Sequence, residues 1–270
     1  MINISVLITC HNRKKKTLHI LNCLKKQKIN KNIKIIIYLV DDGSTDGTAN
    51  SVKKLYPEII LIKGNGNLFW GGALNLAWKK AVNSKYKSDY FLWLNDDVDL
   101  FNDAISNSLD YELKNNYKNF ICVGSTLDSN TNLRSYGGYK LKKKNFNLIN
   151  SYPVIPTNGF QNIDIFNGNF VLIPNKVFNQ VGYLDKLFIH IGADTDYGMR
   201  AQKLGIKIVL MPEYVGYCNK NTNKFKSTKY LNLDMFYFMK RYLKTFKYVY
   251  IAKWYFTYFI NIIFKINLFK

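Results

Sequence analysis

The sequence predicts an α/β fold in which helices cover both faces of a mostly parallel central sheet. Two observations support this prediction. In the first half of the 270-residue chain, short apolar segments alternate with helical segments, the pattern of a parallel sheet covered on both faces. Successive strand segments also end in loops rich in Asp, Asn and Gly. Ligands of open α/β sheets bind at the carboxyl ends of the strands, so a ligand site is expected there.

The strand segments are apolar or aromatic runs bounded by polar and turn residues, and the helical segments carry apolar positions at helical spacing. We expect strands over residues 4–9, 33–40, 59–62 and 90–94, and helices after residue 13, from about residue 48, and over residues 73–82. The run over residues 90–94 is apolar and aromatic and is entered from the polar segment 87–89, which predicts a fully buried strand.

Two adjacent carboxylates, Asp96 and Asp97, follow this buried strand directly. Clustered carboxylates at a sheet edge suit a hard divalent cation and the phosphates that it bridges. Asn and Asp are also ordinary turn residues, so a polar strand-to-loop turn is the alternative interpretation.

Two further loops reach the same edge. Residues 41–48 combine two carboxylates with two glycines and with capping residues for the next helix. Residues 64–72 are rich in glycine, which lets the backbone approach a ligand, and the helix that follows presents its amides there. The first strand-to-helix turn, residues 9–13, has no glycine, which excludes a G-x-G-x-x-G dinucleotide site, and the chain has no G-x-x-x-x-G-K-[ST] loop. This pattern is typical of a mononucleotide-sugar site.

In the second half, residues 167–169 interrupt an otherwise apolar strand with Asn-Gly-Asn. They either line a ligand or form a bulge at Gly168. Pro174 starts a short helix, and Asp194 and Asp196 open another. Two acidic residues in a first turn are, by default, partners of the helix dipole.

The chain carries 39 Lys and Arg residues against 18 Asp and Glu residues, a formal net charge of +21. This charge predicts a polyanionic partner, nucleic acid or an anionic membrane, although an AT-rich genome also favours lysine. The four cysteines lie far apart in the sequence and have no metal-binding spacing. We therefore expect them to be reduced thiols in a cytosolic protein. Because the first strand begins near the start of the sequence, we expect no signal peptide and a cytoplasmic catalytic part.

Six motifs in order resemble glycosyltransferase family 2, over roughly residues 4 to 218. They are Thr9-Cys10-His11-Asn12-Arg13, Val40-Asp41-Asp42-Gly43-Ser44-Thr45-Asp46, Gly66-Asn67-Leu68-Phe69-Trp70-Gly71-Gly72-Ala73-Leu74-Asn75, Leu94-Asn95-Asp96-Asp97-Val98, Phe166-Asn167-Gly168-Asn169-Phe170-Val171-Leu172-Ile173-Pro174 and Asp194-Thr195-Asp196-Tyr197-Gly198-Met199-Arg200. Within that family the chain resembles the bacterial rhamnosyltransferase-like enzymes of surface polysaccharide assembly. The resemblance implies a GT-A fold, a UDP- or dTDP-linked sugar donor, a divalent metal (Mn²⁺ or Mg²⁺) and inversion at the anomeric carbon.

The resemblance also implies roles for individual residues. The nucleotide and donor sugar would contact Thr9, His11, Arg13, Asp41, Asp42, Asn67, Asn75, Asp96 and Asn167. Among these, Asp42 would accept a hydrogen bond from the pyrimidine imide. Asp97 would bind the metal, and Asp194 would be the catalytic base that takes the proton of the acceptor hydroxyl.

The chain departs from the family at two places. Ala193 stands where many relatives have a Glu before the base, so a like charge that helps raise the pKa of the base is missing. Many relatives also have a metal-binding His near the end of the domain, but residues 214–218 contain none. The third protein ligand of the metal is therefore not assigned.

The sequence divides into a catalytic domain over residues 1–220 and a C-terminal helical section over residues 221–270. In the second part ten basic residues face one acidic residue. The segment 248–264 is aromatic and apolar apart from a polar stripe, and its length is marginal for crossing a bilayer. We expect this section to lie on an anionic membrane surface, with Arg241 among the basic residues that face it. Packing of a helical pair on the catalytic domain is the alternative.

Taken together, the sequence predicts a cytoplasmic, metal-dependent, inverting glycosyltransferase at the inner face of the cell membrane. It would transfer a sugar from a nucleotide-diphosphate donor to a lipid-linked glycan in bacterial surface polysaccharide synthesis. Two alternatives remain, a sugar-phosphate nucleotidyltransferase and a non-enzymatic nucleic-acid-binding protein. The first would need a Gly-rich basic loop after the first strand, and the second does not account for carboxylates in three loops at one sheet edge. We expect no nucleic-acid partner.

Overall fold

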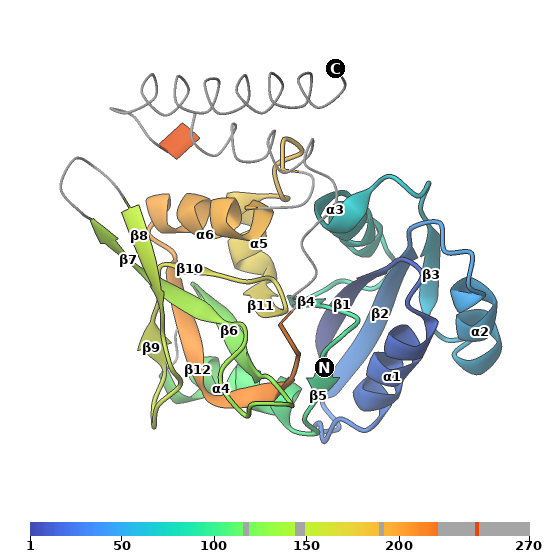
Figure 1. Cartoon of the computed structure of the whole chain (residues 1–270), viewed down its shortest axis with the longest axis horizontal. Helices are drawn as coiled ribbons and strands as arrows, with labels where there is room; N and C mark the ends of the chain where they lie inside the picture. Colours follow the sequence, from blue (N-terminus) through green and yellow to red (C-terminus); the bar gives the residue numbers. More distant parts are fainter. Residues whose placement is uncertain (116–118, 144–148, 189–191, 221–240, 243–270) are drawn as a thin grey trace, which may run out of the picture.

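The computed structural model describes residues 1–115, 119–143, 149–188, 192–220 and 241–242. A nine-stranded sheet forms its centre, in the order β3-β2-β1-β4-β11-β6-β12-β5, with β9 paired to β12 (Figure 1). The strands are β1 (Ile2–Cys10), β2 (Ile33–Asp41), β3 (Ile60–Lys63), β4 (Tyr90–Leu94), β5 (Asp99–Leu100), β6 (Phe120–Leu127), β9 (Gln161–Asn162), β11 (Phe170–Pro174) and β12 (Lys207–Tyr217).

Most strands of this sheet run in one direction. Parallel pairing joins β3 to β2, β2 to β1 and β1 to β4, while β11 runs antiparallel to both β4 and β6. Strand β12 is parallel to β6 and antiparallel to β5 and β9. Strands β1 to β4, β6 and β12 therefore share one direction, and the prediction of a mostly parallel sheet is confirmed.

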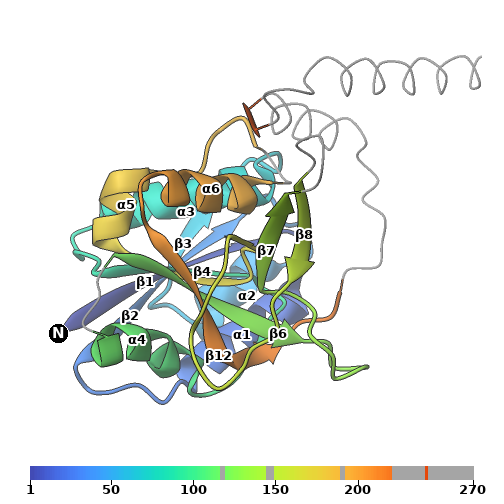
Figure 2. The same ribbon diagram turned by 90° about the vertical axis from the view of Figure 1, so that its left-hand side faces the viewer.

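Helices cover both faces, as predicted (Figure 2). One face packs against α1 (Lys14–Lys25), α2 (Thr48–Leu55) and α4 (Ala104–Asn115), and the other against α3 (Phe69–Val82), α5 (Asn175–Val181) and α6 (Ala193–Lys203). Strand β4 explains how one strand serves two cores: Leu92 faces the first core, and Phe91 and Trp93 face the second. Trp93 packs edge-on against Trp78 of α3, with ring centroids 5.3 Å apart.

A smaller sheet of three antiparallel strands flanks the large one. It pairs β7 (Gly138–Lys143) with β8 (Ile149–Pro153) and with β10 (Ile165–Phe166). Residues 167–169 lie between β10 and β11, so the Asn-Gly-Asn interruption seen in the sequence is the point where the chain passes from the small sheet to the large one.

The predicted elements have the predicted type, with small shifts of their bounds. Helix α3 begins at Phe69, four residues before the predicted start, because Asp42 of a neighbouring loop accepts the N–H groups of Leu68 and Phe69. These donors at the start of a helix have no partner within the helix itself.

No helix in the described part of the chain is long and apolar enough to cross a membrane. The segment 248–264, which the sequence assigns to the membrane surface, lies outside the described residues. Arg241 is described, and its environment is given below.

Candidate functional site

A cavity of about 500 Å³ lies at the edge of the large sheet where β1, β4 and β12 end and β11 begins. Because β11 runs against its neighbours, its first residues meet the last residues of the others. The predicted site residues that line the cavity are Thr9, His11, Arg13, Asp42, Asp96, Asp97, Asn167 and Asp194. These residues come from five of the six motifs, and Gly66 and Trp70 of the remaining motif also line the cavity.

The two carboxylates after β4 face the start of α1. One nitrogen of Arg13 donates to Asp96 Oδ1 at 2.9 Å and to Asp97 Oδ2 at 3.0 Å. Lys16, one turn further along α1, brings its Nζ within 3.7 Å of Asp97 Oδ2. The cations on α1 therefore balance the carboxylate pair.

Asp96 is more deeply buried than Asp97, with side chains 4% and 17% exposed. Burial raises the pKa of Asp96 to about 6, against the lowering effect of Arg13, and the charge of Asp97 adds to the rise. Asp97 is thus the better placed of the two to meet a ligand from the cavity.

The donor atoms around Asp97 fit a divalent metal in part. Carboxylate oxygens are the ligands that Mg²⁺ and Mn²⁺ prefer, and Asp97 offers two of them at the cavity. Cys218 belongs to the segment in which many relatives have a metal-binding His. It lines the cavity, and its Sγ donates to Asp97 Oδ1 at 3.6 Å. Burial raises the pKa of Cys218 to about 12, so it is a neutral thiol beside the carboxylate. Sequence reasoning missed Cys218; its position just after the last long strand was the available signal.

Asp42 holds the glycine-rich loop in place. Its carboxylate accepts the N–H groups of Gly66 at 2.8 Å, Leu68 at 2.9 Å and Phe69 at 3.2 Å. Its backbone oxygen also bonds to His11 Nδ1 at 2.6 Å. Asp42 therefore positions two walls of the cavity, a role that the sequence did not reveal; its bond to a pyrimidine stays a prediction.

Three predicted donor-binding residues do not line the cavity. Asp41 is buried, and its Oδ1 accepts the N–H of Ser44 at 2.9 Å. Asn67 is exposed in the loop before α3. Asn75 is buried, and its amide bonds to both the N–H and the C=O of Leu184, at 3.0 and 2.9 Å. In this structure Asn75 connects α3 to the segment after α5, and its role as a donor contact stays a prediction.

Asp194, in the first turn of α6, lines the cavity. Its oxygens accept the N–H groups of Gly168 at 3.0 Å and Thr195 at 2.8 Å. Burial raises the pKa of Asp194, and these two hydrogen bonds oppose the rise. A partly buried carboxylate of raised pKa at a cavity wall has the properties of a general base. The bond to Gly168 also explains why the Asn-Gly-Asn segment lies beside it.

Close approach requires glycine at position 168. A Cβ there would lie 2.4 Å from the Trp70 ring, whose Nε1 donates to Asn95 Oδ1 at 2.9 Å. The indole of Trp70 is thereby held against this cavity wall.

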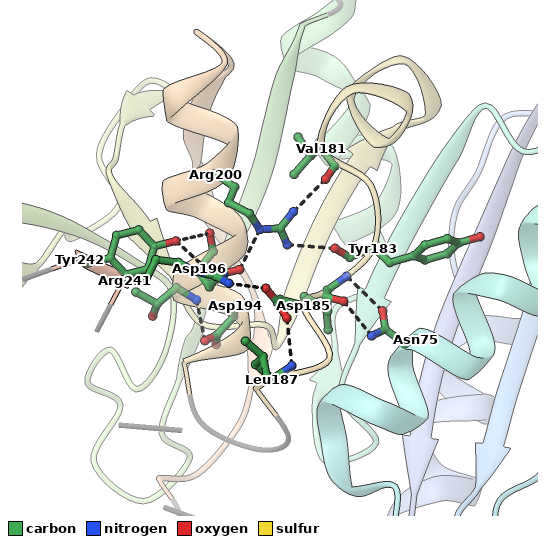
Figure 3. A network of polar contacts seen from close by, with 12 residues as sticks. Asn75, Val181, Tyr183, Asp185, Leu187, Asp194, Asp196, Arg200, Arg241 and Tyr242 are labelled. Carbon is green, nitrogen blue, oxygen red and sulfur yellow. Dashed lines mark hydrogen bonds and ion pairs between the residues drawn. The ribbon is translucent and has the colours of Figure 1, made fainter. Parts of the chain in front are cut away.

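Asp196 lies two residues after Asp194 in the first turn of α6. It is fully buried in a network of polar contacts (Figure 3). It accepts Arg200 Nε at 2.7 Å, Arg241 at 2.7 Å and the Tyr242 hydroxyl at 2.5 Å. Arg200 also donates to the carbonyl oxygens of Val181, the last residue of α5, and of Tyr183. The network thus fixes the first turn of α6 relative to α5.

Arg241 corrects one prediction from the sequence. Its guanidinium bonds to Asp196 and, at 2.6 Å, to Asp185, and its side chain is 30% exposed. A cation with two carboxylate partners within the protein is not available to face a membrane surface. Arg241 and Tyr242 instead contact Asp185 and Asp196 of the catalytic part.

Comparison with known proteins gives the following findings. The sequence matches the family described as Glycosyl transferase family 2 over residues 5–182. A search of curated proteins found no match.

Solved structures with a similar fold include S. aureus TarS 1-349 (16% identity, TM-score 0.58, covering 81% of this chain and 60% of that one). They also include the mannosyltransferase PcManGT from Pyrobaculum calidifontis in complex with GDP-Man and Mn²⁺ (13%, 0.57, 83% and 58%). A third is GalNAc-T7 with UDP, GalNAc and Mn²⁺ (14%, 0.66, 87% and 47%). The chain therefore spans 47–60% of the length of these three proteins, and at such identities the likeness shows a shared fold.

Proposed function

This chain belongs to glycosyl transferase family 2, and on that premise we propose that it is an inverting glycosyltransferase that uses a nucleotide-diphosphate sugar. One observation carries the proposal: the carboxylate pair Asp96 and Asp97, which follows β4, and the partly buried Asp194 of α6 line the same cavity. The first pair suits the diphosphate end of a donor, and Asp194 suits the acceptor end. If Asp96 and Asp97 only formed a turn after β4, neither the adjacent carboxylate pair nor a third carboxylate at the same cavity would be required.

The proposed reaction is a single displacement. An acceptor hydroxyl attacks the anomeric carbon of the donor from the side of Asp194, and the bond from that carbon to the diphosphate breaks. Asp194 takes the hydroxyl proton as the new bond forms, so the acceptor oxygen need not become a free alkoxide. Attack opposite the leaving group inverts the configuration.

The diphosphate gains negative charge as it leaves. A divalent metal held by Asp97 would stabilise that charge without proton transfer. Arg13 and Lys16, which now pair with the carboxylates, add positive charge on the same wall. His11 and Thr9, at the end of β1, border the space for the base and ribose.

For substrates, we propose a UDP- or dTDP-linked sugar as donor and a lipid-linked glycan of bacterial surface polysaccharide as acceptor, as in the rhamnosyltransferase-like enzymes. Neighbours of similar fold were solved with UDP-GlcNAc, with GDP-Man and with UDP, which supports a nucleotide-sugar donor. The basic and aromatic section after residue 242 supports attachment to the cytoplasmic face of an anionic membrane.

A thermal-shift screen tests this function. A ligand that binds only the native state stabilises it by about 2.7 kcal/mol at a concentration 100 times its Kd. We expect UDP or dTDP, and one of their sugar conjugates, to raise the Tm with Mn²⁺ or Mg²⁺ and less without metal. If ATP or a DNA duplex raises the Tm and no pyrimidine diphosphate does, the proposed function is wrong.

A further inference from the structure

A second group of side chains that could hold a metal ion lies where α1 meets β5. His19 and Cys23 are four residues apart on this helix, and Asp99 begins β5. Their ligand atoms all lie within 4.8 Å of one another. None of the three lines the cavity that contains Asp97 and Asp194. The group is therefore separate from the proposed donor site.

The distances within this group resemble the edges of a tetrahedral site. In such zinc sites the metal lies about 2.3 Å from sulfur and about 2.0–2.2 Å from nitrogen or oxygen. Those bond lengths place sulfur about 3.6 Å from each of the other two ligand atoms. Here Cys23 Sγ lies 3.6 Å from His19 Nε2 and 3.6 Å from Asp99 Oδ1. Two edges of the tetrahedron are thus in place.

The third edge has the length of a hydrogen bond. His19 Nε2 lies 2.8 Å from Asp99 Oδ1, whereas two ligands of one zinc ion would be about 3.4 Å apart. Both side chains are more than half exposed, at 54% and 59%, so they have room to open by the remaining distance of about 0.6 Å. Their exposure also gives an ion and a water molecule access to the site.

The fold holds the three residues together without a ligand. Positions four apart share one face of a helix, which places His19 above Cys23. Asp99 is fixed by the pairing of β5 with the end of β12, where Tyr217 lies opposite Asp99. A Cβ on the neighbouring Gly216 would lie 2.2 Å from the Asp99 carbonyl oxygen, so glycine permits this close pairing. The ligand group is therefore supported from two elements.

The ligand types favour zinc over the metals expected at Asp97. Thiolate and imidazole are softer ligands than carboxylate and water, and they suit Zn²⁺ rather than Mg²⁺ or Mn²⁺. One thiolate and one carboxylate also balance the two charges of the ion. Burial raises the pKa of Cys23 above its usual value, which leaves a protonated thiol beside Asp99 when no metal is bound.

We propose that His19, Cys23 and Asp99 bind a zinc ion, with a water molecule as the fourth ligand. The Cys23 thiol gives its proton to solvent as the sulfur–zinc bond forms. His19 coordinates through Nε2 with its proton on Nδ1, and its hydrogen bond to Asp99 breaks. The ion would connect α1, which carries Lys16 and directly follows Arg13, to β5, the strand that follows Asp97. This inference is independent of the proposed function.

Metal binding to the full chain tests the proposal, in an Asp97→Asn background that removes the other metal ligand. After equilibrium dialysis against Zn²⁺, we expect one bound zinc per chain by atomic absorption. Replacement by Co²⁺ should give a thiolate-to-cobalt charge-transfer absorption band. A further Cys23→Ser change should abolish the band and lower zinc affinity at least tenfold. His19→Gln, at an exposed position, should also lower the affinity, which covers the case in which the Cys23 variant fails to fold.

Cys218→Ser is the matched control, because it makes the same replacement at another buried cysteine that lies beside position 97. It should keep both the bound zinc and the cobalt band. The proposal is overturned if the Asp97→Asn chain binds no zinc, or if the His19 and Cys23 variants bind zinc as tightly as their parent. Loss of the band in Cys218→Ser alone would place the metal in the cavity and would also overturn it.

Discussion

At the scale of single residues, Asp194 combines the two conditions that a catalytic base needs. Burial favours its protonated form, and the N–H groups of Gly168 and Thr195 favour its charged form. The net effect is a pKa above that of an exposed Asp, so the Asp194 carboxylate is more basic than an exposed one. Ala193 does not remove this property, because the raised pKa arises from burial rather than from a neighbouring Glu.

We therefore expect Asp194→Asn to keep donor binding and to lower turnover by about 10²- to 10⁴-fold, the usual contribution of a general base. Steady-state kinetics with a glycan acceptor would measure the loss, and calorimetry with the nucleotide would check binding. If instead the variant unfolds while each folded molecule keeps its activity, Asp194 is a helix-dipole partner and not the base.

The pKa of Asp194 also predicts a pH dependence. Because burial raises this pKa above the ordinary value of 3.8, the base becomes protonated, and kcat falls, at a higher pH than an exposed Asp would require. The acid limb of the kcat profile should therefore have an apparent pKa above 3.8. The residual activity of Asp194→Asn should lack this limb. A kcat that stays constant down to the pH of acid unfolding would contradict the assignment.

At the scale of elements, Arg241 and Tyr242 join the C-terminal section to α6. Their carboxylate partner Asp196 has no exposed surface, and Arg200 alone would leave part of it without hydrogen bonds. An unsatisfied buried acceptor costs about 1–3 kcal/mol. These contacts connect Arg241 and Tyr242, which lie beyond the predicted boundary at residue 220, to the catalytic part of the chain.

Arg241→Ala should thus lower the free energy of unfolding by about 1–3 kcal/mol in urea denaturation. Lys25→Ala is the control, because its partner Glu58 and Lys25 itself are about half exposed and such pairs contribute about 0–1 kcal/mol. Equal effects of the two changes would show that the Arg241 contacts do not stabilise the fold.

At the scale of the whole molecule, the membrane proposal rests on the residues after position 242. The basic residues there contribute about 1 kcal/mol each near an anionic surface, and salt screens this attraction. The full chain should therefore pellet with anionic liposomes more at low salt than at high salt. A chain that ends after Tyr242 should stay folded and remain in the supernatant, whereas one that ends after Asn232 should be less stable. If the full chain ignores liposomes and both truncated chains precipitate, the section is part of the core.

Much of this organisation could be predicted from the sequence, because short-range patterns determine it. Apolar runs predicted the strands, and parallel strands necessarily bring their carboxyl ends to one edge, so Asp42, Asp96 and Asp97 could be placed together. The contacts that could not be predicted join positions far apart: Asn75 with Leu184, Cys218 with Asp97, and Arg241 with Asp196. Only the tertiary packing decides such pairs, and no local pattern marks them.

In the proposed function, Asp97 would hold a metal that binds the diphosphate of a nucleotide sugar. Calorimetric titration of the full chain with UDP, and with dTDP, in the presence and absence of Mn²⁺ tests it most directly. We predict saturable nucleotide binding that requires the metal. In Asp97→Asn, which changes the charge of one ligand at nearly constant volume, Mn²⁺ should no longer increase the affinity for the nucleotide. Unchanged, metal-enhanced affinity in a folded Asp97→Asn chain would contradict the account.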